Sequence, residues 1–475
     1  ALDVIPKSGL GPDELVLLAT LQGLVARTSS EQIYIDEGGP STIWKQNLAD
    51  RHGVTLDGSR ATWPALLEHF RDHTKGYILY DRAAQARSLT AATALAGPLG
   101  AIAVDVSLEA NVKGLGLTMT ADVRGHDEKW AYDQYPGRFS TRTAAEQAPT
   151  IYHQLRDYIT LTSSFTFYDG LTPFRAKVMQ GLDREAFCFG YYGLDEFGMV
   201  SNATAQGVVM IPSDFAANLS VHSSVRARAG LAQRGFATPA PEADVHYVTF
   251  VLSDGDNVAF DLQTMQQTFA DPVRGSFDMG YEISPALVDL APATMRWYYE
   301  KASAGAHRDF FVAGPSGSGY MFPSKMPAAD LPPYLDRLDS FLAAGNLNMV
   351  AILDRGAVGR MELWNAYLAR PHIDAVLYFD YDYNTKGEIA FSPEHEPVIA
   401  SRDRLWGGIT EEAELTSRIN ARPKTPTSAA GYTMVQVHVW TKKLPNVLTV
   451  VKGLDPKVRV VTPDAFVKLI RMNLK

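Results

Sequence analysis

The stretch Tyr247-Val248-Thr249-Phe250-Val251-Leu252-Ser253-Asp254-Gly255-Asp256-Asn257 sets the pattern for the second half of this 475-residue chain. Its first six residues are aliphatic, aromatic or β-branched, which is typical of a strand buried on both faces. Acidic and amide side chains follow at once, in a turn that contains glycine. Residues directly after a buried parallel strand lie at its C-terminal end, where ligands bind. The stretch therefore predicts a strand followed by a functional loop.

The same pattern recurs through residues 241–475, where about eight buried strands are followed in most cases by a helix. The predicted strands are Tyr247–Leu252, Asp278–Glu282, Phe310–Ala313, Asn348–Leu353, Ala375–Phe379, Pro397–Ala400, Met434–Val439 and Val458–Val461. This series predicts an α/β fold with a C-terminal (β/α)8-type barrel that is TIM-like and irregular near its short sixth strand. Residues 386–391 look like a hairpin rather than a crossover helix.

Helix and strand patterns also alternate from the N-terminus onward, which predicts a parallel sheet with covered faces. We expect an N-terminal α/β domain at 1–120, a second α+β region at 121–240 and the barrel at 241–475. The segment Thr143–Tyr158 is predicted as a helix of the second region. The linker-like Thr238-Pro239-Ala240-Pro241 marks the last boundary.

The composition excludes several classes of partner. The net charge of −9, without a cluster of Lys or Arg, argues against nucleic acid and anionic membranes. No apolar run approaches the ~18 residues of a membrane span. Because the nucleotide-binding, serine-hydrolase, zinc-protease and dithiol motifs are absent, we predict no cofactor and no metal. Nothing in the pattern indicates an oligomeric state.

Two features bear on the compartment. The chain begins at Ala1 rather than at methionine, as a secreted protein does after removal of its signal peptide. The single cysteine, Cys188, lies in an apolar run and is predicted to be a buried, inert thiol. We expect a secreted or extracytoplasmic protein.

The segment Gly317-Ser318-Gly319-Tyr320-Met321-Phe322-Pro323 follows the third predicted strand and combines a tight turn with two aromatic side chains. It resembles the signature of the GxGYxYP family of glycoside hydrolases, with Phe322 in place of the second tyrosine. Residues 253–257, Ile283-Ser284-Pro285 and residues 218–223 resemble further parts of that family. The resemblance covers most of the chain. It implies an N-terminal α/β portion, export from the cell and cleavage of glycosidic bonds in a poly- or oligosaccharide.

Glycosidic cleavage uses two carboxylates, one that protonates the leaving oxygen and one that attacks the sugar or activates water. Because barrel active sites form at the C-terminal ends of strands, we predict both groups there. The catalytic candidates are Asp254, Asp256, Glu282 and Asp380. The substrate-binding candidates are Asn257, Tyr281, Tyr320, Asp354, Arg355, Asp382, His438 and Trp440. We expect these side chains to gather around one opening.

Two alternatives stay open. The strand-then-acid pattern, with His438 late in the chain, is also typical of metal-dependent polysaccharide hydrolases and deacetylases, although no HxxxH pair follows the first strand. A non-catalytic carbohydrate-binding protein would use the same acids to hold sugars without cleaving them. Chelation separates the first alternative from the leading hypothesis, and a search for turnover separates the second.

Overall fold

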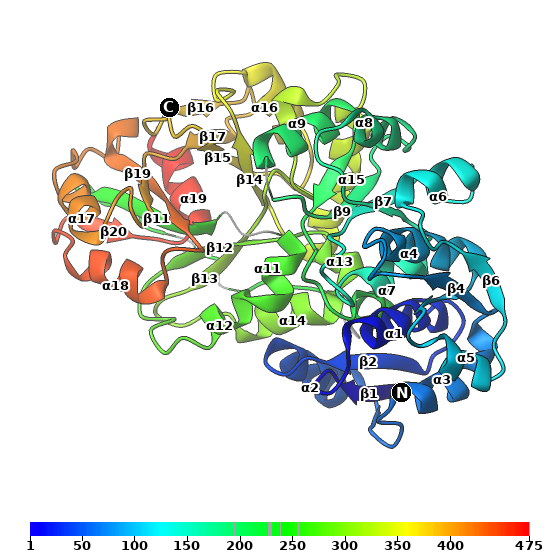
Figure 1. Ribbon diagram of the computed structural model, residues 1–475. Coiled ribbons are helices and arrows are strands. Elements are labelled where there is room, and N and C mark those ends of the chain that lie inside the picture. The colour runs from blue at the N-terminus through cyan, green and yellow to red at the C-terminus, as the bar shows by residue number, and fades with distance from the viewer. Residues whose placement is uncertain (194, 227–229, 235, 238, 254–256, 475) are drawn as a thin grey trace. The chain divides into compact units, whose positions relative to one another are not determined.

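The computed structural model describes residues 1–193, 195–226, 230–234, 236–237, 239–253 and 257–474 (Figure 1). The chain divides into two compact units. Unit 1 comprises Ala1–Arg228 with Asp289–Thr294, and unit 2 comprises Ala229–Val288 with Met295–Lys475. Within the described residues, no helix is both long enough and apolar enough to cross a membrane.

Unit 1 holds three parallel sheets, with strand orders β2-β1-β3, β5-β4-β6 and β10-β9-β7-β8. The strands are β1 (Leu2–Pro6), β2 (Gln32–Asp36), β3 (Leu56–Asp57), β4 (Tyr77–Tyr80), β5 (Ile102–Asp105), β6 (Met119–Asp122), β7 (Thr143–Glu146), β8 (Phe165–Phe167), β9 (Phe187–Gly190) and β10 (Val209–Ile211). The helices are α1 (Pro12–Val25), α2 (Pro40–His52), α3 (Trp63–His69), α4 (Ser88–Leu99), α5 (Glu109–Gly114), α6 (Glu128–Gln134), α7 (Arg156–Thr162), α8 (Pro173–Gln180), α9 (Glu196–Ala205) and α10 (Leu219–Ser224).

Close helix packing holds the centre of unit 1. Both α1 and α4 pack against α7. A Cβ atom at Gly23 of α1 would overlap the backbone of Asp157, and one at Gly97 of α4 would overlap that of Thr160. Glycine at these two positions therefore lets three helices approach more closely than any side chain would permit.

The prediction of a helix over Thr143–Tyr158 is wrong. The first four residues of this segment form β7, which pairs with β8 on one side and β9 on the other. The helix α7 starts only at Arg156, beyond Pro149, which cannot continue a helical hydrogen-bond pattern. Pairing on both edges outweighs the helix propensity of the alanines and glutamate in this segment.

Unit 2 is built on one long sheet with the order β16-β17-β15-β14-β13-β12-β11-β19-β18, and β20 also pairs with β11. The strands are β11 (His246–Ser253), β12 (Met279–Ile283), β13 (Asp309–Ala313), β14 (Met349–Asp354), β15 (Ala375–Asp380), β16 (Ile389–Phe391), β17 (Pro397–Ala400), β18 (Asp403–Leu405), β19 (Tyr432–His438) and β20 (Val458–Val460). Neighbours are parallel except β16, which forms the expected hairpin with β17. The sheet curls, because β17 pairs with β15 while β18, two residues later, pairs with β19.

The α/β class is confirmed, whereas the (β/α)8 barrel is not. β19 pairs directly with β11 from Tyr247↔Tyr432 to Ser253↔His438. The last predicted strand, β20, therefore does not lie between β19 and β11. It pairs with the start of β11, at His246–Val248, on the edge that β12 takes further along.

Helices cover the outer side of the curled sheet, and one helix lies inside it. The helices of this half of the chain are α11 (Asn257–Gln263), α12 (Met265–Phe269), α13 (Leu287–Leu290), α14 (Pro292–Lys301), α15 (Leu331–Gly345), α16 (Met361–Leu368), α17 (Glu412–Asn420), α18 (Leu444–Lys452) and α19 (Pro463–Asn473). The inner helix, α19, contacts β11, β13 and β17 (Figure 1, red). Phe466 of α19 packs against Tyr432, the first residue of β19, so α19 fills the N-terminal end of the curl.

Candidate active site

The register of the strands separates an inner from an outer face at the C-terminal end of the sheet of unit 2. Paired residues of parallel strands point to the same face, and consecutive residues point to opposite faces. Tyr281 pairs with Phe311, and both rings pack on Phe269 of α12. Tyr281 therefore lies on the outer, helix-covered face. Glu282, the next residue, points to the inner face.

Glu282 is buried at this inner face, with 7% of its surface exposed. It belongs to β12 and lies next to Gly314, which directly follows β13. A Cβ atom at Gly314 would overlap the Glu282 carboxylate. Only glycine at position 314 therefore leaves room for the acid in this position.

His438 lies on the same face and at the same level, two strands away. Its partner in the register is Ser253 of β11, and β11 lies between β12 and β19. The His438 ring stacks on Trp406, with centroids 3.6 Å apart and planes at 4°, and its Nδ1 lies 2.7 Å from Thr441 Oγ1. Glu282, Ser253 and His438 therefore form one row across three neighbouring strands.

The helix α11 adds two polar side chains one turn apart. Asn257 and Asp261 are both buried and, four residues apart, lie on one side of the helix. Asp261 Oδ2 accepts a hydrogen bond of 3.0 Å from the backbone N–H of Ser284, just beyond the end of β12. Burial raises the pKa of Asp261 to about 8. This carboxyl is therefore protonated at neutral pH.

Two polar side chains near the strand ends are buried with no hydrogen-bond partner among the described residues. They are the amide group of Asn257 and the hydroxyl of Ser284. They follow two neighbouring strands, β11 and β12. Buried polar groups are nearly always hydrogen-bonded, since leaving one unpaired costs roughly 1–3 kcal/mol.

The carboxylates of β14 and β15 do not join this row. Asp354 pairs with Asp380, and Tyr378, two residues before Asp380, packs on Trp364 of α16. Both acids therefore lie on the outer face, opposite to Glu282. The expectation that all the strand-end acids gather around one opening is wrong for these two.

Hydrogen bonds give Asp354 and Asp380 structural roles instead. Asp354 is fully buried and accepts bonds of 2.7 Å from the backbone N–H and the hydroxyl of Ser324, just past the glycine-aromatic motif, and burial raises its pKa. Asp380 accepts from the backbone N–H groups of Gly356, Asp382 and Asn384 and from the Tyr378 hydroxyl.

The remaining candidates lie in several environments. Tyr320 is buried and its ring meets Phe322, whose ring meets Tyr381. Arg355 and Asp382 form an exposed ion pair of 2.7 Å. Trp440 is 45% exposed and presents its ring edge-on to Phe260.

Three further candidates are Tyr281, Asp254 and Asp256. Tyr281 is a core residue on the helix-covered face, which does not suit substrate binding. Asp254 and Asp256 lie outside the described residues.

Sequence reasoning missed Asp261, Trp406 and Gly314 as parts of the site. The four-residue spacing of Asn257 and Asp261 could have indicated the first, had the helix been predicted to begin at Asn257. Trp406 had no signal, because the short β18 before it was not predicted.

One group of described residues, in unit 1, has the geometry of a metal site. Ligand atoms of Asp3, Glu31 and His69 lie within 4.8 Å of one another. The guanidinium of Arg60 already lies there, with Nε 2.6 Å from Asp3 and Nη2 2.8 Å from Glu31. Because this cation balances the acids and would repel a metal ion, the group is better described as an ion-pair cluster.

An α/β protein with a buried carboxylate and unpaired polar groups at parallel strand ends has the layout of an α/β enzyme. Four family models match the chain: the GxGYxYP first domain over residues 1–72, the second over 74–139, the third over 141–224 and the "GxGYxYP putative glycoside hydrolase C-terminal domain" over 244–471. The chain belongs to the GxGYxYP family.

A solved structure is similar over the whole chain. It is described as a "putative hydrolase" from Bacteroides thetaiotaomicron VPI-5482, with 44% sequence identity and a TM-score of 0.95. The similarity covers 100% of this chain and 95% of that one. No curated protein matches the chain. The family and this neighbour support a hydrolase.

Proposed function

We propose that this protein hydrolyses glycosidic bonds of a poly- or oligosaccharide, with Glu282 as one of the two carboxylates. The row on the inner face carries the proposal, because it holds the buried carboxylate of Glu282 in line with Ser253 and His438 at the C-terminal end of the sheet. A sugar offers hydroxyl groups that both donate and accept hydrogen bonds. Asn257 and Ser284, which follow β11 and β12, are the groups proposed to bind them.

The second carboxylate is proposed from the sequence alone. Asp254 and Asp256 follow Ser253, the last residue of β11, and β11 pairs with β12. In glycoside hydrolysis one carboxyl group protonates the leaving oxygen, while the other attacks the anomeric carbon or activates a water. His438, in the same row as Glu282, would contact a sugar hydroxyl.

The proposal is tested by incubating the protein with a panel of poly- and oligosaccharides and measuring new reducing ends. On the substrate that is cleaved, Glu282→Gln is expected to lower kcat by about 10²–10⁴-fold, because glutamine preserves the shape of the side chain but cannot transfer a proton. The matched control is Glu362→Gln, at a side chain that is 69% exposed. Full activity of Glu282→Gln contradicts the proposal.

Two other readouts identify the alternatives. Release of acetate that stops on chelation indicates a metal-dependent deacetylase. Sugar binding without any product, in the wild-type protein, indicates a carbohydrate-binding protein. Either result replaces glycosidic cleavage as the function.

A further inference from the structure

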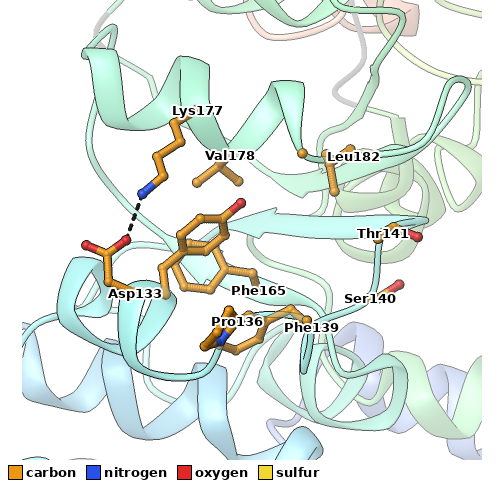
Figure 2. Close-up of a pocket in the computed structure, with 12 residues that line it drawn as sticks. Asp133, Pro136, Phe139, Ser140, Thr141, Phe165, Lys177, Val178 and Leu182 are labelled. Carbon is orange, nitrogen blue, oxygen red and sulfur yellow. Dashed lines mark hydrogen bonds and ion pairs between the residues drawn. The ribbon is translucent and has the colours of Figure 1, made fainter.

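Unit 1 contains a hollow that is lined by residues between 132 and 182. It has a volume of about 330 Å³ and is bounded by α6, by the segment 136–141 and by α8 (Figure 2). Sites for small molecules range over about 300–1,000 Å³, so the hollow has room for one small ring. We call it the α6–α8 pocket.

Aromatic rings form the inner wall of the α6–α8 pocket. The Tyr132 and Phe165 centroids are 4.7 Å apart, and those of Phe139 and Phe165 are 4.9 Å apart. Tyr132 and Phe139 are nearly parallel, with an interplanar angle of 3°. Phe165 is buried beneath the other two, which are partly exposed. Gly181 is part of this arrangement, because a Cβ atom there would come within 2.8 Å of the Tyr132 hydroxyl.

The rim of the pocket is polar and electrically balanced. Lys177 of α8 and Asp133 of α6 form an ion pair of 2.7 Å across one side of the hollow, as Figure 2 shows. Their side chains are 56% and 58% exposed, so both groups remain within reach of a ligand. The Lys177 ammonium also lies 5.3 Å from the centre of the Tyr132 ring. Ser140 and Thr141 lie on the opposite side.

These features define the chemistry of the ligand. The two charges on the rim cancel, which favours a neutral molecule over an ion. Aromatic walls favour a ligand with a flat apolar face, and an adjacent donor and acceptor favour neighbouring hydroxyl groups. A pyranose ring has all three properties, since its C–H face is apolar and its edge carries vicinal hydroxyls.

We propose that the α6–α8 pocket is a glycan-binding site that holds one sugar unit of a longer chain. The inference rests on the proposed function for its substrate class, yet the pocket shares no residue with the row on the inner face of unit 2. Binding here would raise the local concentration of a polymer around the enzyme, because the second contact becomes intramolecular. It would add little to the turnover of a short oligosaccharide.

The test uses the full-length protein carrying Glu282→Gln, so that probes are not consumed. Native gels are cast with xylan, galactomannan, laminarin or amylopectin, and retardation of the protein gives an apparent Kd for each polymer. On the polymer that retards the protein, Phe139→Ala is expected to raise Kd at least fivefold. Lys177→Met, which keeps the aliphatic stem but removes the ammonium, is expected to raise it at least threefold. The control is Phe215→Ala, an aromatic side chain of unit 1 that is 52% exposed.

The outcomes separate this proposal from the proposed function. If Phe139→Ala and Lys177→Met both abolish retardation, and the wild-type protein cleaves none of the polymers, the glycan-binding pocket is supported while the hydrolase proposal fails. Cleavage by the wild type, with retardation unchanged in both variants or absent on all four polymers, overturns the pocket. Lys177→Met carries the test if Phe139→Ala lowers the melting temperature, because the ammonium is exposed and its removal leaves the apolar wall in place.

Discussion

At the scale of single residues, Gly314 and Glu282 depend on each other. We predict that Gly314→Ala lowers kcat/KM by at least about tenfold, because the added methyl would displace the Glu282 carboxylate. Steady-state kinetics on the cleaved substrate check this. Gly359→Ala is the matched control, since a Cβ atom there meets nothing within 4 Å. Equal kinetics for both variants would show that the position of the carboxylate does not matter.

Asp261 gives a residue-scale prediction on pH. Its folded-state pKa of about 8 lies above the ordinary value of 3.8, so the folded protein holds a proton that the unfolded chain loses. The contribution of Asp261 to stability is therefore greatest below pH ~4 and declines as the pH rises towards 8. Asp261→Asn, which keeps an acceptor for Ser284, is expected to flatten the pH dependence of the melting temperature and to be the more stable protein at pH 8.

A second variant separates this titration from the loss of a hydrogen bond. Asp261→Ala removes the acceptor for the Ser284 N–H at every pH, so its melting temperature should lie below that of Asp261→Asn throughout. If the melting temperatures of the wild type and Asp261→Asn change equally with pH between pH 5 and 8, the assigned ionisation of Asp261 is contradicted.

At the scale of elements, eight strands of unit 2 could be predicted from the sequence to within about two residues, because each is largely an apolar run, whereas the short β18, with the sequence Asp-Arg-Leu, could not. The same continuity hides which face each side chain takes. A strand buried on both faces shows no alternation, so nothing in the run ending at Asp380 reveals that it faces α16 while Glu282 faces inward. Strand ends could therefore be found from the sequence, whereas the acid that belongs to the site could not.

Asp380 gives the prediction at this scale. Asp380→Asn replaces an oxygen acceptor by an amide donor, among four groups that all donate to the carboxylate. We expect a loss of about 1–3 kcal/mol in the free energy of unfolding, measured by denaturant titration, because at least one donor loses its acceptor. The folded fraction should retain kcat within about tenfold of wild type, in contrast to Glu282→Gln. A thousandfold loss of kcat at unchanged stability would return Asp380 to the catalytic candidates.

At the scale of the whole molecule, the chain does not divide into its two units at a single point in the sequence. Most of unit 1 precedes residue 229, yet Asp289–Thr294, which follows β12 in the sequence, also belongs to it. Ala293 is 2% exposed and packs in one cluster with Leu2 and Tyr34. Its carbonyl also accepts a bond of 3.3 Å from Asn47 Nδ2. The sequence gives no sign of this return, because the segment reads simply as the loop and helix after a strand.

This arrangement yields a prediction about unit 1 from a residue in the second half of the chain. Ala293→Glu would bury an unpaired carboxyl beside Leu2 and Tyr34, and we expect it to lower the free energy of unfolding by at least about 2 kcal/mol. Thermal melts of the full-length protein measure the effect, with exposed Ala306→Glu as the control. A fragment of residues 1–228 lacks this segment altogether, so it should melt below the unit in the intact chain. If the fragment melts as the intact chain does and Ala293→Glu matches its control, then Asp289–Thr294 does not stabilise unit 1.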